Sequence, residues 1–175
     1  MARPSHFLTI ILISPLAMVC PSFSCPDTCK DEINLSLYLR QASTPPNPNQ
    51  EVIYQPEPPK TFGAVAIMDW TLLDAPVATA KVLGHAQGVH VMSDLARVLW
   101  YTSFNLVFQG DRFNGSTLQV MGVTSTAAGE WAIVGGTGQL AMASGTIKHQ
   151  YVAWSDVEYF RKIDIHALYT SNSMN

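Results

Sequence analysis

The chain has 175 residues, of which 47% are apolar and only 13% are charged, and its formal net charge is −3. This length is enough for one domain with a real hydrophobic core. The lack of a basic excess argues against nucleic acid as a partner, and the low charged fraction favours a compact β domain with a lined interior.

The first 24 residues have the pattern of a signal peptide. Arg3 supplies a positive start, residues 7–19 are apolar but too short to cross a bilayer, and Ser22 and Ser24 predict cleavage before Cys25. An N-terminal membrane anchor is the alternative. We therefore expect a secreted protein of the extracellular space with no membrane partner.

Cys25 and Cys29 would remain after that cleavage, and an oxidising compartment would allow them to pair. The loop that this disulfide closes is so short that it would stabilise the fold very little. Pairing between two chains is the alternative, and a metal or redox role is weaker because no second pair of ligands follows. We expect residues 25–32 to be an N-terminal extension and residues 171–175 a tail.

Apolar and polar residues alternate strictly over residues 33–40, which predicts a half-buried strand. Residues 41–59 carry six prolines and are predicted to form a mobile loop. Further strands are predicted at residues 61–69, 80–93, 98–109, 116–123, 131–134, 145–153 and 159–169. About eight strands with no long helix predict an all-β fold, an eight-stranded antiparallel up-and-down β-barrel whose closure hides the sheet edges. A two-sheet sandwich is the alternative.

An Asn-Gly pair, Asn114 and Gly115, lies between two alternating runs and predicts a β-hairpin. Asn114 also begins an Asn-x-Ser glycosylation sequon at the expected tip. Asn34 begins a second sequon on the polar face of the first strand. Both are predicted glycosylation sites, with Asn114 the better exposed.

Residues 136–141 read Gly-x-Gly-x-x-Ala after a short strand, as in a dinucleotide-binding loop. A nucleotide-binding unit needs a full helix at this point, but another strand is predicted to begin at Gly145. The glycines of residues 135–138 are therefore expected to form a tight turn with positive φ angles, and no cofactor is expected.

The histidines beyond residue 24 show no metal-binding spacing, so no metal site is expected. His85 and His90 are five residues apart in one predicted strand and should point to opposite faces. His149 and His166 are interpreted as ordinary strand histidines.

Asp69 shares a strand face with Val65 and Ile67, which predicts that it points into the interior near a barrel mouth. A lone buried carboxylate is costly and is often functional. A turn cap at the strand end is the alternative.

Several short motifs resemble, in this order, the dirigent family of secreted plant proteins, and the match runs from about residue 33 to residue 169. They are Ile67-Met68-Asp69-Trp70, Ala86-Gln87-Gly88, Phe104-Asn105-Leu106-Val107-Phe108, Asn114-Gly115-Ser116-Thr117-Leu118, Val134-Gly135-Gly136-Thr137-Gly138 and Tyr159-Phe160-Arg161. Residues 100–105 and 130–133 look like the grass subgroup that is often fused to a jacalin-type lectin, although no lectin domain is expected here. The resemblance implies a dirigent barrel, shared with allene oxide cyclases, over residues 33–170.

The resemblance implies a scaffold in the apoplast, not an enzyme, that is usually a homo-oligomer, a dimer or trimer. Such proteins hold phenoxy radicals of monolignols such as coniferyl alcohol, made by a separate oxidase of laccase or peroxidase type. They steer stereoselective coupling in lignan-type phenylpropanoid biosynthesis by orienting the reactants. One alternative is a defence-related, carbohydrate-associated binding module that aggregates a β-glucosidase. Another is an isomerase or cyclase.

The expected pocket of this barrel would favour flat aromatic ligands. Its candidate lining residues are Gln41, Asp69, His90, Tyr101, Phe104, Thr124 and Phe160. Family members that act on lignan precursors carry an Asp where this chain has Gln41 and again at Thr124, and an Arg where it has Gly129. The acid–base and cationic groups of the pocket are therefore expected to be mostly missing, and no residue is assigned a catalytic role.

Overall fold

The computed structural model describes residues 30–110, 112–125 and 128–170. The predicted signal peptide, the Cys25–Cys29 pair and the tail at residues 171–175 lie outside these residues. The strands are β1 (Asp31–Gln41), β2 (Gln50–Tyr54), β3 (Val65–Leu73), β4 (Val82–Met92), β5 (Trp100–Phe108), β6 (Thr117–Thr124), β7 (Gly129–Thr137), β8 (Ser144–Trp154) and β9 (Tyr159–Tyr169), with a 3-10 turn, η2 (Gly138–Leu140), after β7.

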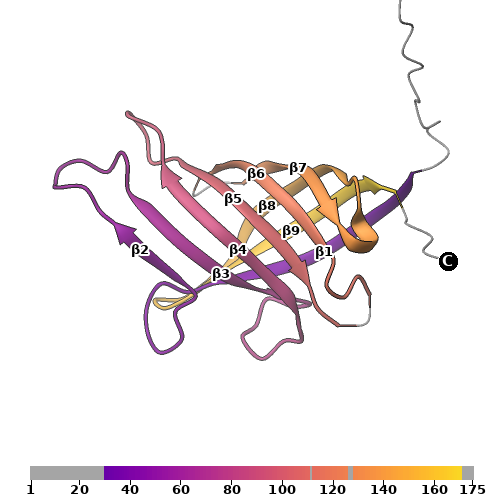
Figure 1. Ribbon diagram of the computed structural model, residues 1–175. Helices are drawn as coiled ribbons and strands as arrows, with labels where there is room; N and C mark the ends of the chain where they lie inside the picture. Colours follow the sequence, from indigo (N-terminus) through magenta and orange to yellow (C-terminus); the bar gives the residue numbers. More distant parts are fainter. Residues whose placement is uncertain (1–29, 111, 126–127, 171–175) are drawn as a thin grey trace, which may run out of the picture.

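Eight of these strands close into an antiparallel barrel in the order β1-β9-β8-β7-β6-β5-β4-β3 (Figure 1). β1 pairs with β9 along its whole length, from Asp31 opposite Tyr169 to Gln41 opposite Tyr159. The barrel then closes through only three pairs between β1 and β3, centred on Leu39 opposite Leu72. The predicted all-β barrel is confirmed, and the sandwich is not formed.

β2 is a ninth strand that lies within the segment predicted to be a loop. It takes the edge of β3 that β1 leaves free, with Gln50 opposite Met68 and Val52 opposite Ala66. The many prolines of residues 41–59 favour the prediction of a loop. All of them lie outside Gln50–Tyr54, so they flank the strand and do not interrupt it. In Figure 1, β2 and the first half of β3 extend beyond the rest of the barrel wall.

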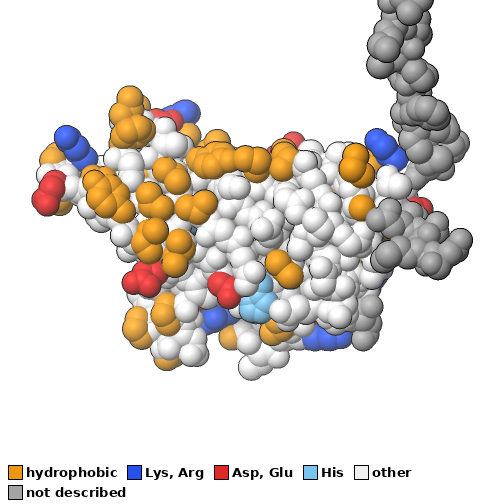
Figure 2. Space-filling model, in the orientation of Figure 1, with side chains coloured by type: hydrophobic (Ala, Val, Ile, Leu, Met, Phe, Trp, Pro, Cys, Tyr) orange, Lys and Arg blue, Asp and Glu red, His pale blue; other side chains and the backbone are white. Residues whose placement is uncertain are grey.

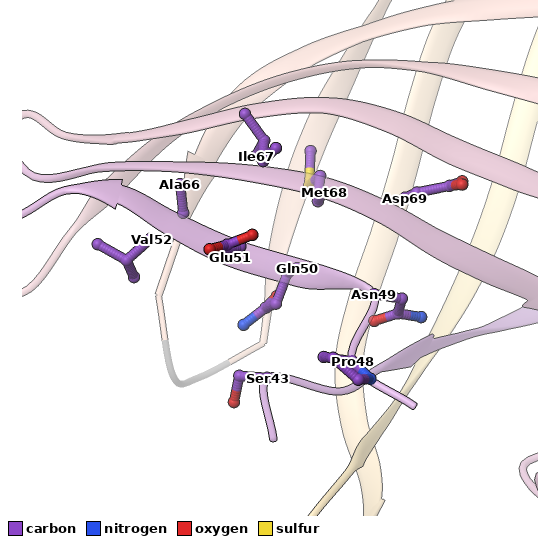
Figure 3. A pocket seen from close by; sticks show the side chains of 10 residues that line it. All are labelled: Ser43, Pro48, Asn49, Gln50, Glu51, Val52, Ala66, Ile67, Met68 and Asp69. Atoms are coloured by element: carbon purple, nitrogen blue, oxygen red, sulfur yellow. The ribbon is translucent and has the colours of Figure 1, made fainter. Parts of the chain in front are cut away.

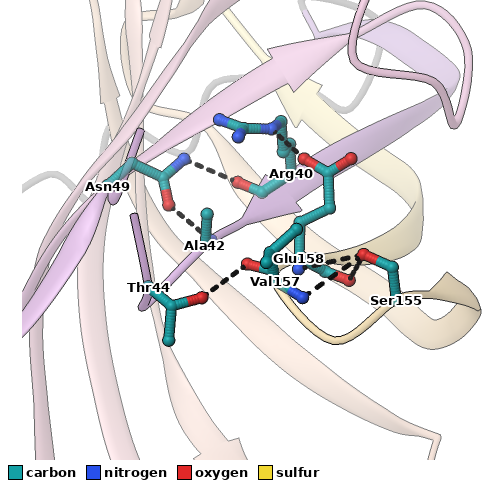
Figure 4. A network of polar contacts seen from close by, with 7 residues as sticks. All are labelled: Arg40, Ala42, Thr44, Asn49, Ser155, Val157 and Glu158. Atoms are coloured by element: carbon teal, nitrogen blue, oxygen red, sulfur yellow. Dashed lines mark hydrogen bonds and ion pairs between the residues drawn. The ribbon is translucent and has the colours of Figure 1, made fainter. Parts of the chain in front are cut away.

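The connection from β1 to β2 is fastened to the turn between β8 and β9 (Figure 4). Arg40 forms an ion pair with Glu158, and the Thr44 hydroxyl donates to the Val157 carbonyl at 3.4 Å. The Asn49 side chain accepts from the Ala42 amide at 2.8 Å and donates to the Arg40 carbonyl at 2.9 Å. These contacts hold the rim of one barrel end.

The predicted hairpin forms between β5 and β6, with Thr117 opposite Val107, and Asn114 is exposed in its connection. The predicted glycine turn is wrong in detail. Gly135 and Gly136 belong to β7, and of this run only Gly138 has a positive φ, 63°. Gly136 serves close packing instead, since a Cβ there would lie 2.0 Å from the Leu140 carbonyl oxygen.

Alternation along the strands packs apolar side chains into the barrel interior. The largest fully buried apolar side chains are Trp70, Trp131, Ile33, Leu39, Leu72, Leu73, Leu106, Leu118, Leu140, Ile147 and Ile163. One barrel end is plugged by Phe108 and Phe113, whose rings lie 5.8 Å apart, together with Tyr169. The opposite end, where β1 and β8 finish and β9 begins, is not plugged.

On the face shown in Figure 2, apolar side chains gather around β2 and the start of β3, and others lie along the upper edge. Exposed apolar side chains also occur on other strands, among them Met121, Val134 and Trp154. Within the described residues, no helix is long and apolar enough to cross a membrane.

Candidate functional site

A cavity of about 190 Å³ opens at the unplugged end of the barrel. Residues of β1 to β6, β8 and β9 contribute to its wall, together with Val98 and Ser125 from the adjoining connections. Its lining residues are Gln41, Gln50, Val52, Ala66, Trp70, His90, Val98, Trp100, Thr124, Ser125, Tyr151 and Tyr159. Aromatic side chains with a few polar groups among them are typical of a small-molecule site.

The structure brings three of the predicted pocket residues, Gln41, His90 and Thr124, to this cavity. Each occupies a strand end at the open side of the barrel, and each is at least 93% buried. His85 lies on the outer face of β4 and His90 on the inner face, as predicted.

Asp69 does not point into the interior. Its side chain is 54% exposed, and its carboxylate lies 2.8 Å from Nδ1 of His85 on the outer face of the barrel. The inward positions of β3 are Ala66, Met68 and Trp70, so Asp69 falls on the opposite face.

Tyr101 and Phe160 are likewise absent from the cavity lining. Tyr101 lies between the inward-facing Trp100 and Thr102, and Phe160 precedes the inward-facing Arg161. Phe104 is buried deeper, where its ring lies 5.2 Å from that of Trp131, and it belongs to the core rather than to the cavity wall.

A chain of hydrogen bonds crosses the inner wall from β7 to β4. The indole of Trp131 donates to the Thr124 hydroxyl at 3.0 Å. The Thr124 hydroxyl lies 2.6 Å from the Thr102 hydroxyl, and the Thr102 hydroxyl lies 2.7 Å from Nδ1 of His90. An indole can only donate, so Thr124 accepts from it and its own proton is free to go to Thr102. When Thr102 in turn donates to Nδ1, the neutral ring of His90 carries its proton on Nε2.

A second polar group lies beside this chain, on β8 and β9. Arg161 is fully buried, and its Nη1 donates to Nδ1 of His149 at 2.5 Å. His149 stacks on Trp131 with ring centroids 3.9 Å apart, and the guanidinium lies 3.9 Å from the ring centre of Tyr151, which lines the cavity. A buried cation therefore lies beside the cavity, although Arg161 is not among the residues that line it.

Sequence reasoning missed Arg161, although one signal points to it. Ile163, Ile165 and Ala167 alternate on the inner face of β9, and the same alternation continues back to Arg161. From the sequence, Arg161 is assigned only to the motif Tyr159-Phe160-Arg161 and not to a site.

Burial and Arg161 together make both inner histidines poor bases. Burial, with the positive charge of Arg161 as a smaller cause, lowers the pKa of His90 to about 4 and that of His149 to about 3. Burial also lowers the pKa of Arg161 itself, whereas Tyr151 raises it. A guanidinium keeps its proton at any pH at which proteins fold, so the interior holds one cation and two neutral imidazoles near pH 7.

A larger hollow, about 700 Å³, runs along β2 and β3 near the β1–β2 connection (Figure 3). Its side chains leave both faces of the two strands and include exposed residues such as Glu51, Ile67 and Asp69. No buried polar atom without a partner is found there among the described residues, so we assign the site to the smaller barrel cavity. No group of three or more potential metal ligands is found in the described part of the chain.

The model of the family described as "Dirigent-like protein" matches residues 32–168. The chain is 30% identical over 119 residues to pterocarpan synthase 1 of Glycyrrhiza echinata. This match covers 64% of this chain and 63% of that protein. It is also 30% identical over 118 residues to dirigent protein 1 of Arabidopsis thaliana, covering 64% and 65%. The chain thus spans slightly less than two-thirds of the length of these relatives.

A solved structure described as a pterocarpan synthase dirigent protein superimposes with a TM-score of 0.77 at 25% identity. The match covers 83% of this chain and 89% of that one.

Replacing Thr102 by Val should break the hydrogen-bond chain at its centre. Thr124 and His90 would each lose a partner inside the barrel, so we expect the free energy of unfolding to fall by about 1–3 kcal/mol. The matched control is Thr117→Val, which removes an exposed hydroxyl 2.7 Å from Thr137 and should change stability by less than about 0.5 kcal/mol. Urea unfolding measures both. Equal losses in the two variants would contradict the chain as described.

Acidification should destabilise the protein through His90 and His149. Both are neutral when folded but regain an ordinary pKa, about 6.5, when unfolded, so the unfolded state binds more protons below pH 6.5. The stability present above pH 6.5 should be lost progressively down to about pH 4 for His90 and pH 3 for His149. Between pH 7 and 5 we expect a loss of about 2 kcal/mol for each histidine. The double variant His90→Gln, His149→Gln should show a flatter dependence, and an unchanged slope would contradict this assignment.

Proposed function

This chain belongs to the dirigent family, and on that premise we propose that its barrel cavity binds phenolic ligands and orients them for stereoselective bond formation. The observation that carries the proposal is the aromatic-lined cavity at the open barrel end, with Trp70, Trp100, Tyr151 and Tyr159 in its wall. Such rings bind flat ligands through area burial and stacking.

In the first form of the proposal, the ligands are phenoxy radicals of monolignols such as coniferyl alcohol, supplied by a separate oxidase. Holding one radical face against the wall leaves only one direction open to its partner, so orientation alone sets the stereochemistry. We include in this proposal secretion to the apoplast and assembly as a homo-oligomer.

The cavity size limits how the two reactants are held. A volume of about 190 Å³ is smaller than the roughly 300–1,000 Å³ of sites for drug-sized ligands. It suits one phenylpropanoid ring and its side chain. The second reactant would then approach at the opening, against rim residues such as Val52 and Val98.

The test is oxidase-driven coupling of coniferyl alcohol with and without the protein, read out as the enantiomeric excess of the dimers. We expect an excess with the wild type and a loss of most of it in Trp100→Ala, which removes a cavity wall. The matched control is the adjacent Tyr101→Ala on the outer face, which should keep the excess. Racemic product with the wild type would refute this substrate.

The names of the relatives favour a second form, in which the protein promotes product formation without an oxidase. A pterocarpan synthase is among the matched relatives and among the solved structures that superimpose on the barrel. The Nε2 proton of His90 and the buried charge of Arg161 could both favour negative charge developing on a substrate oxygen in a site of low polarity.

For this form, the protein would be given the substrate of the Glycyrrhiza echinata relative, with that relative as the positive control and no oxidant present. We expect pterocarpan formation that falls on the order of a hundredfold in His90→Gln, a loss typical for removal of a donor to developing charge. A rate no higher than in buffer would contradict the second form and leave the first to the coupling assay.

A further inference from the structure

The buried polar atoms without a hydrogen-bond partner share one property. In the described part of the chain they are Nε2 of Gln41, Nε2 of His149, and Nε and Nη2 of Arg161. The arginine and amide nitrogens are donors. Nε2 of His149 is also a donor, because Nδ1 accepts from Arg161 and the neutral ring carries its one proton on the other nitrogen. All of them therefore need an acceptor.

The charge of Arg161 has no counter-ion either. Among the described residues, no carboxylate forms an ion pair with it, and the side chain is completely buried. Its neighbours are the ring of Trp131, a neutral imidazole and Tyr151, whose ring lies against the guanidinium and whose side chain hydrogen-bonds to it. A buried, unpaired charge costs several kcal/mol, and orphaned buried donors add to that cost.

We propose that the ligand supplies the missing acceptor and counter-ion, so that the cavity binds an aromatic compound carrying an anionic oxygen, either a phenolate or a carboxylate. The inference names the charge of the ligand in the site proposed above, and it rests on that cavity being the ligand site.

The placement of Gln41 and Arg161 supports the proposal, whereas His149 is not among the residues that line the cavity. Gln41 lines the cavity directly, and Tyr151 both lines it and covers the guanidinium, so one side chain separates the cation from the cavity. No Asp or Glu is found among the described residues that line the cavity. No acidic side chain of the lining offsets the charge of Arg161, which at low dielectric is weakly screened across a single ring.

The first experiment uses the wild-type protein and 4-nitrophenol, whose absorbance reports its ionisation. Burial alone would favour the neutral phenol, whereas a nearby cation favours the phenolate, so the sign of the change decides. We expect the phenolate to bind about tenfold or more tightly than the phenol, seen as a lower pKa of the bound probe. Equal binding of the two forms, or tighter binding of the phenol, would overturn the proposal.

A parallel titration separates the two sources of the anion. Benzoate is compared with its neutral methyl ester, and 4-nitrophenolate with 4-nitroanisole, by calorimetry. A preference for only one anion over its neutral counterpart identifies that source, and both preferences together support the shared chemistry. No preference in either pair overturns the proposal.

Variants then assign the preference to Arg161. Arg161→Met should abolish it, and the matched control Arg40→Met, at an arginine paired with Glu158 on the outside, should retain it. Because an apolar residue replaces an unpaired buried ion, Arg161→Met is expected to fold at least as stably as the wild type in urea unfolding. A preference that survives in folded Arg161→Met would overturn the assignment, and the wild-type titration decides the proposal if this variant fails to fold.

The outcomes also separate this inference from the proposed function. An anion preference with racemic coupling and no oxidase-free turnover would refute the proposed function alone. Stereoselective coupling by a protein that prefers the neutral probes would refute the anion site alone.

Discussion

The shape of the site depends on how the barrel closes. β1 pairs with β9 over its full length but with β3 over only three residues, Tyr38, Leu39 and Arg40. Beyond that point the edge of β3 is occupied by β2, so β1 and β3 separate and the wall is incomplete at one end. A barrel of eight strands is just wide enough to be filled by its own side chains. The cavity exists because closure stops short of this end.

The polar groups of the interior form one band at that same end. Six consecutive strands, β4 to β9, each contribute one side chain to it, in the order His90, Thr102, Thr124, Trp131, His149 and Arg161. From β4 to β7 each side chain is hydrogen-bonded to the next. At β8 and β9 donors remain, together with an unpaired charge. The side chains from β4 to β7 are therefore linked by hydrogen bonds, whereas donors on β8 and β9 have no partner in the described residues and remain for a ligand.

The barrel was predictable because its strands alternate cleanly and its turns are marked by glycine and asparagine. The facing of some side chains was not. Residues 65–68 are all apolar, so a period of two does not tell which face is inside, and Asp69 was assigned to the wrong one. Trp100 and Tyr101 present the same ambiguity, since two aromatic residues in succession leave the inward one undetermined. In both cases the answer comes from pairing with neighbouring strands, which one strand's sequence does not contain.

Gly129 on β7 lies next to the buried polar groups of β8 and β9. The resemblance implies an Arg at this position in family members that act on lignan precursors. A Cβ at Gly129 would lie 2.9 Å from Nε2 of His149, so the glycine leaves room for the imidazole. That ring in turn stacks on Trp131 and accepts from Arg161. The three positions are thus coupled: the space beside Gly129 on β7 is filled by His149 from β8, and Arg161 reaches His149 from β9.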